Sequence, residues 1–200
     1  MVQKFRLMVL SGAILSGLIS FLPQISAADA YKIDPAHSSF GFSVSHLMVS
    51  KITGVFNDYE GVINFDPKDL STASADVAIQ TASIDTRAAK RDDHLRSADF
   101  FDAKTFPLIK FQGKKFVSSG DQYLITGDLT IKGVTKEITI PVKITGPVAS
   151  PMGGTVLGLS GQITINRQDY GVSWNKNLDN GGVVVGNDVD VQINIEAGEK

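Results

Sequence analysis

The 200-residue sequence contains no cysteine, so disulfide bonds, thiolate metal ligands and cysteine nucleophiles are all excluded. Positive charge is scarce as well, because 19 Lys and Arg residues are outnumbered by 21 Asp and Glu residues. Proteins that bind nucleic acid usually carry a basic patch or stripe, and we therefore expect no nucleic acid partner. The folded state must be stabilised by apolar burial and backbone hydrogen bonds.

Only one long apolar run occurs, and it lies at the N-terminus. Lys4 and Arg6 come before it, residues 7–22 form it, and small residues follow Pro23. A positive, an apolar and a small-residue region in this order are typical of a secretory signal peptide. A transmembrane anchor is the competing interpretation, but such an anchor needs about 20 consecutive apolar residues.

We therefore expect a cleaved signal peptide over residues 1–27, with Ala30 as the alternative cleavage point. The remaining residues, 28–200, have the size of one domain with a sizeable core. No linker, internal repeat or low-complexity tract divides them. The expected location of the mature chain is the periplasm, with no transmembrane anchor after cleavage.

Apolar residues at every second position dominate the rest of the sequence, which is typical of β-strands with two different faces. In the last such stretch Val189, Val191, Ile193 and Ile195 alternate with polar residues. Similar patterns occur in residues 40–48, 55–65, 75–83, 108–117, 123–131, 138–145 and 157–166.

Turn residues separate these stretches, as at Lys132-Gly133, Ser150–Gly154 and Asp66–Lys68. About eight strands result, mostly joined to their sequence neighbours. Such strands either stack as a sandwich or close on themselves, and closure removes the exposed edges. We therefore expect an all-β fold, an antiparallel eight-stranded barrel.

One stretch, residues 87–96, is rich in helix formers and predicts one short helix, capped by Asp85 or Thr86. Arg87, Arg91 and His94 are spaced i, i+4 and i+7 and would share one helical face. Three donors on one face could bind a phosphate or another polar head group.

A solvated face is an equally good interpretation, in which the arginines pair with Asp92, Asp93 or Asp99. Arg96 would lie on a different side of the helix. We expect it to support the Asp99–Asp102 turn.

Evidence for an enzyme is weak. The three histidines, His37, His46 and His94, lie far apart and match no metal-binding spacing, so we expect no metal site. Gly158–Gly161 is one residue away from a nucleophile elbow but lies within a strand pattern, where a twist or bulge is the better interpretation. We expect no catalytic residues and no cofactor. An enzyme that uses these histidines on an amphiphilic substrate is the second hypothesis.

If the barrel is hollow, inward-facing apolar residues would line it. His46 would be either a core histidine or a polar point in the cavity, and Tyr170 and Trp174 would either cap the mouth or fill the core. The candidate lining residues are Phe40, Phe42, Val44, His46, Met48, Phe65, Ile79, Ile125, Leu129, Ile140, Ile163, Ile165 and Trp174.

Four segments resemble those of the YceI-like proteins. Arg91–Phe101 and Gly127–Lys136 are similar to the hallmark segments of that family, Tyr31–Ser38 to its start, and Ser83–Thr86 to its lead into the helix. The similarity covers essentially all of the mature chain.

This resemblance implies an extended, lipocalin-like barrel with a long internal pore. It also implies a ligand, which would be a polyprenyl phosphate, an isoprenoid quinone or a fatty-acid-like amphiphile. Some members are homodimers, so a homodimer is an open alternative. Arg91, His94 and Arg96 match the family's pattern, whereas Arg87 lies outside it. The third hypothesis is a stress-related envelope interaction protein with a filled core and no lipid ligand.

Overall fold

The computed structural model describes residues 28–179 and 181–199. The expected signal peptide, residues 1–27, lies outside the described residues. Within them eleven strands occur: β1 Asp29–Ile33, β2 Ser39–His46, β3 Ser50–Phe56, β4 Tyr59–Phe65, β5 Ser74–Gln80, β6 Ile84–Asp85, β7 Leu108–Ser119, β8 Gln122–Ile131, β9 Val134–Ala149, β10 Thr155–Asn166 and β11 Val185–Glu199. The helix α1 is Ala89–Arg96, and 3₁₀ turns span Leu70–Thr72, Thr81–Ser83 and Arg167–Tyr170.

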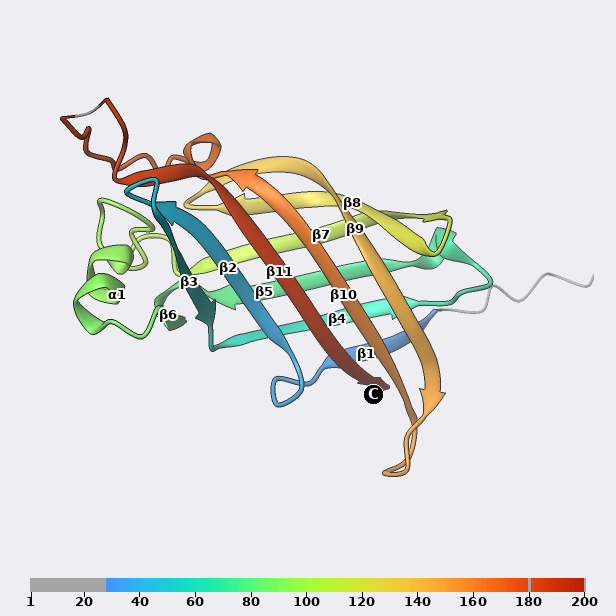
Figure 1. Cartoon of the computed structure of the whole chain (residues 1–200). Coiled ribbons are helices and arrows are strands. Elements are labelled where there is room, and N and C mark those ends of the chain that lie inside the picture. The colour runs from blue at the N-terminus through green and yellow to red at the C-terminus, as the bar shows by residue number, and fades with distance from the viewer. Residues whose placement is uncertain (1–27, 180, 200) are drawn as a thin grey trace, which may run out of the picture.

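Eight of these strands close into a barrel (Figure 1). Their order around the ring is β1, β4, β5, β7, β8, β9, β10 and β11, and β11 pairs again with β1. Every neighbouring pair is antiparallel. The prediction of an all-β, eight-stranded antiparallel barrel with one short helix is confirmed.

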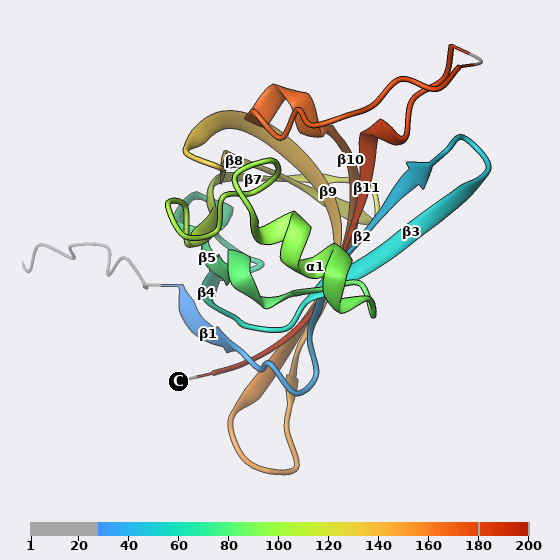
Figure 2. The same cartoon turned by 90° about the vertical axis from the view of Figure 1, so that its left-hand side faces the viewer.

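The remaining strands, β2, β3 and β6, extend the sheet from β11. The sheet branches at the long strand β11. One edge of β11 pairs with β2 over residues 185–194 and with β1 over residues 197–199. At the α1 end of the barrel, the β2–β3 hairpin leans away from the ring (Figure 2).

The strand boundaries differ from the sequence pattern in two places. Residues 55–65, expected as one strand, are broken at Asn57-Asp58 into β3 and β4. Asn and Asp favour turns because their side chains hydrogen-bond nearby backbone. The stretch expected over 40–48 ends at His46, because Leu47 and Met48 have positive φ and turn the chain into β3.

The helix begins at Ala89, two residues later than expected. Arg87 has φ of 62° and so lies outside the helix, and the N-cap residue Ala88 offers no side-chain cap. The predicted capping by Asp85 or Thr86 is therefore wrong. Asp85 accepts a hydrogen bond from the Arg87 backbone N–H at 2.7 Å, and Thr86 instead donates to Asp92 in the first turn.

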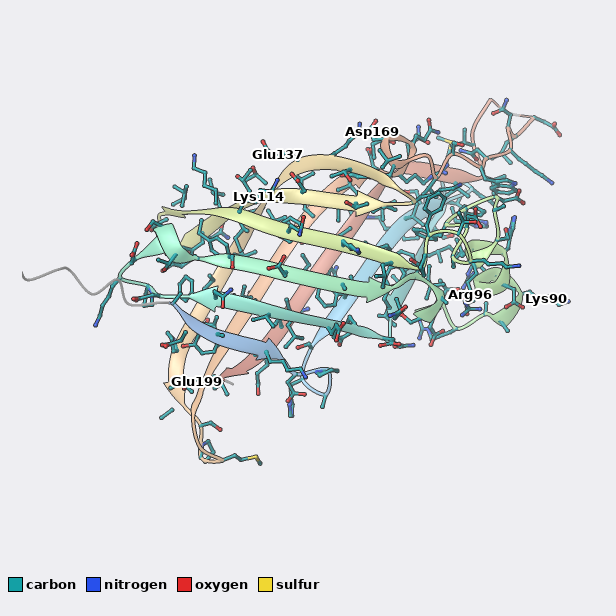
Figure 3. All side chains as sticks on the ribbon, turned by 180° about the vertical axis from the view of Figure 1, so that it is seen from behind. Lys90, Arg96, Lys114, Glu137, Asp169 and Glu199 are labelled. Atoms are coloured by element: carbon teal, nitrogen blue, oxygen red, sulfur yellow. The ribbon has the colours of Figure 1, made fainter. Side chains whose placement is uncertain are left out.

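Buried apolar side chains form two clusters. The larger one extends from Tyr31, Phe65 and Leu157, at the end of the barrel away from α1, into the barrel, whereas the smaller one, with Phe100 and Tyr170, lies under α1. Charged side chains such as Lys114 and Glu137 stand on the outer surface (Figure 3). No helix among the described residues is long and apolar enough to cross a bilayer.

Candidate functional site

An apolar cavity extends through the barrel from the α1 end to beyond its middle, as far as Ala75 and Ile195. Its volume is about 210 Å³, counted as the space open to the centre of a water molecule. By that measure a single water needs about 10–15 Å³, so the cavity could hold a much larger group. Only two of its lining residues, Lys110 and Arg167, carry charge. An apolar cavity of this kind favours an apolar occupant over water.

Cross-strand rows build the wall of the cavity. Val191 on β11 lies between Ile163 on β10 and Phe42 on β2, and all three line the cavity. Because side chains alternate between the faces of a strand, the next inward row, two residues along, contains Ile165, Val189 and Val44. The alternating pattern of β11 thus predicted its inward face correctly.

Nine predicted lining residues do line this cavity. Their contact with a ligand stays a prediction, although their position is now defined. They are Phe40, Phe42, Val44, Ile79, Ile125, Leu129, Ile140, Ile163 and Ile165.

The other four candidates lie outside the cavity wall. His46 is the last residue of β2, and Met48 is exposed in the turn that follows. Phe65 is buried in the packed end, where its ring lies 5.5 Å from that of Tyr123. Trp174 packs on the rings of His94 and Phe100 outside the cavity. Alternation indicates which face a residue occupies, but not how far along the barrel it lies.

The α1 segment supplies a cover that the sequence interpretation missed. Leu95, Phe100 and Phe101 line the cavity, and α1 lies across that end of the barrel (Figure 2). The Phe101 ring meets Phe56 of β3 in an edge-on contact at 6.1 Å. Two adjacent aromatic residues directly after a polar helix were the available signal.

Two polar side chains of α1, Arg91 and Asp92, are engaged with Thr86 in the segment before the helix. Arg91 donates from Nε to the Thr86 hydroxyl and from Nη2 to the Thr86 carbonyl, both at 2.7 Å. Thr86 in turn donates its hydroxyl and its backbone N–H to Asp92, at 2.5 and 2.9 Å. Burial would raise the pKa of Asp92, but these hydrogen bonds and the charge of Arg96 outweigh it and hold the pKa below its usual value.

The remaining head-group candidates lie near the surface of the same end. His94 is hydrogen-bonded through Nε2 to Asp99 at 3.0 Å, and Arg87 is exposed in the loop before α1. Arg87, Arg91 and His94 are not part of the cavity wall, and the expected helical face fails because Arg87 precedes the helix. Any contact of these residues with a head group stays a prediction.

Arg96 supports a different segment from the one expected. Its guanidinium donates to the carbonyls of Ala82 and Ile84, both at 2.7 Å, and to Asp93 at 3.1 Å. The side chain therefore ties α1 to the 3₁₀ turn and β6. Its backbone carbonyl accepts from the N–H of Ala103, the residue after the predicted Asp99–Asp102 turn, at 2.9 Å.

Arg167 is a buried charge that sequence reasoning missed. It is only 6% exposed, and its side chain lines the α1 end of the cavity. The guanidinium donates to the carbonyls of Val172 (2.5 Å) and Trp174 (3.0 Å), and to those of Val185 (3.3 Å) and Gly186 (2.8 Å). No carboxylate among the described residues pairs with it, and burial lowers the pKa of the guanidinium. Arg167 thus joins residues 172–174, which follow β10, to residues 185–186 at the start of β11.

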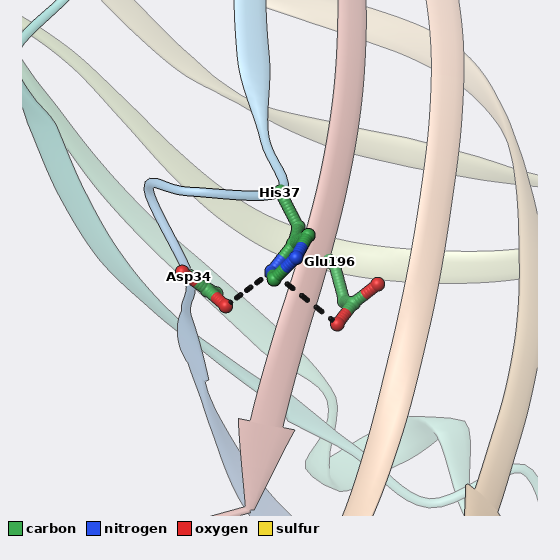
Figure 4. A group of neighbouring side chains, drawn as sticks. All are labelled: Asp34, His37 and Glu196. Carbon is green, nitrogen blue, oxygen red and sulfur yellow. Dashed lines mark hydrogen bonds and ion pairs between the residues drawn. The ribbon is translucent and has the colours of Figure 1, made fainter. Parts of the chain in front are cut away.

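The three histidines do not converge in the part of the chain that the structure describes. His37 instead meets two carboxylates, Asp34 at 2.7 Å and Glu196 at 3.9 Å (Figure 4). The hydrogen bond and charge of Asp34, together with the charge of Glu196, raise the pKa of His37. All three are solvent-accessible, and the arrangement is explained by an exposed ion pair that ties the turn before β2 to β11.

Comparisons with known proteins agree with this architecture. The YceI-like domain family matches residues 31–197. A UPF0312 protein of Staphylococcus aureus (strain N315) is 40% identical over 167 residues, which cover 83% of this chain and 95% of the relative.

Among solved structures, Burkholderia cenocepacia BcnA has a TM-score of 0.73 at 26% identity and covers 82% of this chain and 99% of its own. The Campylobacter jejuni YceI protein has a TM-score of 0.66 at 34% identity, covering 78% and 90%. A polyisoprenoid-binding domain from Saccharophagus degradans shares the fold, with a TM-score of 0.64 at 18% identity and coverage of 86% and 99%. From the extent of the family match and the identity to the staphylococcal relative, this chain belongs to the YceI-like family.

Proposed function

We propose that this protein binds a long-chain amphiphile in the barrel and carries it within the periplasm. The ligand would be an isoprenoid lipid, such as a polyprenyl phosphate or an isoprenoid quinone, or a fatty-acid-like molecule. The apolar cavity is the observation that carries this proposal. The fold shared with a polyisoprenoid-binding domain from Saccharophagus degradans supports it.

The chemistry of the cavity wall favours a hydrocarbon tail inside. Burying each methylene is worth about 0.8 kcal/mol, so a few isoprene units supply several kcal/mol before entropic losses. The packed cluster around Phe65 and Leu157 blocks the far end, and the tail would therefore enter from the α1 end. A polar head group would remain there, where Arg87 and His94 are candidates for contacting it.

Binding explains the arrangement better than catalysis does. A general acid–base mechanism needs titratable groups that converge on one reacting atom. Here His37 lies in the turn before β2, His46 at the end of β2 and His94 on α1. The cavity also counts against an interaction module with a filled core.

The direct test is to purify the protein from the periplasm, extract it with organic solvent and identify lipid by mass spectrometry. Val191→Trp would place a large ring in the cavity, whereas the adjacent Gln192→Trp would point outward from the same strand. We expect bound lipid in the wild type and in Gln192→Trp, and much less in Val191→Trp. Folded Val191→Trp, verified by circular dichroism, with an unchanged lipid content would contradict the proposal, as would a wild type without lipid.

A further inference from the structure

The turn between β2 and β3 exposes three consecutive apolar side chains. Leu47 is 38% exposed, Met48 69% and Val49 85%. These residues, named here the apolar tip, lie on the hairpin that leans away from the barrel at the α1 end (Figure 2). Scattered apolar residues are normal on a surface, but three together at a protruding tip call for an explanation.

The backbone of the apolar tip is also unusual for these residue types. Leu47 and Met48 both have positive φ, at 52° and 62°, in a turn closed by the Val49 N–H donating to the His46 carbonyl at 3.2 Å. Glycine and asparagine are favoured in such a turn, and bulky side chains are strained in it. A backbone outlier of this kind motivates a search for function at the site.

The apolar tip is held in place and is connected to the cavity wall. The Leu47 N–H donates to the Val184 carbonyl at 2.9 Å, which ties the tip to the segment before β11. The next residue, Val185, lies opposite His46 in the sheet and lines the cavity. Backbone pairing therefore links the apolar tip to the cavity wall at Val185.

The geometry points to insertion of the apolar tip into the interface of a phospholipid bilayer, which would bring the α1 end of the barrel against the membrane. A specific protein interface uses about 20 to 30 residues on each side, far more than this convex tip offers. Interfacial insertion needs only a small apolar element that enters about 5–10 Å into the headgroup region. Exposed Lys176 supplies a cation beside the tip, since its carbonyl accepts from Val184 N–H, whereas the ammonium of Lys51 on β3 is already paired with Asp190 at 2.8 Å. This inference goes beyond the proposed function and does not depend on it.

The opposite end of the barrel offers a matched control. Met152 is 97% exposed in the β9–β10 turn, but it is flanked by Pro151 and Gly153, and the packed cluster separates it from the cavity. Because the natural chain has no cysteine, Met48→Cys and Met152→Cys each carry a single thiol. Each variant of the mature protein would be labelled with an environment-sensitive fluorophore and mixed with vesicles of phosphatidylethanolamine and phosphatidylglycerol.

We expect the emission of the label at position 48 to shift to the blue on addition of vesicles, and that of the label at position 152 to stay unchanged. In unlabelled protein, Met48→Ser with Val49→Ser should lower co-sedimentation with the vesicles by at least roughly tenfold, and Met152→Ser should not. No shift at position 48, or equal shifts at both positions, would overturn the inference. Val191→Trp leaves the apolar tip unchanged and places a large ring in the cavity. If the label at position 48 still shifts with vesicles when Val191→Trp is added to Met48→Cys, docking to the bilayer does not require lipid binding in the cavity.

Discussion

The two ends of the barrel are stabilised in different ways. Away from α1, the rings of Phe65, Phe116 and Tyr123 pack together with Tyr31 and Leu157, and the interior is filled. At the α1 end the interior is a cavity, and its frame is held by charged side chains bonded to backbone carbonyls and to Thr86. A hollow end lacks the dense apolar contacts that stabilise a packed one.

The difference shows how a β-barrel can be open inside without losing its shape. Arg167 and Arg96 donate to carbonyls of the loop after β10, of a 3₁₀ turn and of the ends of short or irregular strands. These bonds fix the frame at the edge of the cavity, so the apolar space inside need not be filled. Stability at this end should therefore depend on polar groups, and at the other end on apolar volume.

The largest expected effect is at the packed end. Phe65 is 1% exposed, and Phe65→Ala would leave a void, with an expected loss of about 3–5 kcal/mol in the free energy of unfolding. Phe42→Ala, on the half-buried cavity wall, should cost only about 1–2 kcal/mol, because part of that ring already faces empty space. Urea denaturation of both variants measures the contrast, and equal losses would show that the two ends are packed alike.

The next effect concerns the frame of the cavity. Arg167→Met keeps much of the side-chain length but removes the guanidinium donor from four carbonyls, of which only that of Val185 keeps another side-chain donor, Asn175, and we expect a loss of about 3 kcal/mol. Hydrogen exchange should rise mainly in residues 172–174 and 185–186 and little in β1 and β4. Arg167→Lys should fall between the two, because one ammonium group cannot reproduce the fork of a guanidinium. Exposed Arg87→Met is the control, and an equal loss there would contradict the role of Arg167.

Where apolar alternation is regular, as in β11, the sequence was sufficient for the direction of the side chains. Val189 and Val191 face inward as their alternation with Asp190 and Gln192 predicted. The same rule could not distinguish Phe42, on the cavity wall, from Phe65, in the packed end. Both alternate correctly, and the distinction depends on position along the barrel, which only the strand register determines.

The polar frame was beyond sequence reasoning for another reason. The carbonyls of Val185 and Gly186 lie 18 and 19 residues from Arg167, and nothing local identifies them as its partners. Similarly, the helix was expected, but its start at Ala89 depends on the positive φ of Arg87, which an arginine rarely adopts.

The smallest predicted effect tests whether charge, and not only hydrogen bonding, holds the hollow end together. The folded-state pKa of Asp92 lies below its unfolded value of about 3.9. Its contribution is therefore complete above that unfolded value and is lost as the pH falls through the lower folded-state pKa. We expect Asp92→Asn to lower the free energy of unfolding by about 2 kcal/mol at neutral pH, because the charged acceptor of two Thr86 hydrogen bonds is removed. Urea denaturation across the acid range should show this difference shrinking as the wild-type carboxylate is protonated.

The neighbouring Asp93→Asn, which removes an exposed ion pair with Arg96, should cost less than about 1 kcal/mol. A difference for Asp92→Asn that stays constant into strong acid would mean that the carboxylate charge contributes nothing, and that shape alone joins α1 to the barrel.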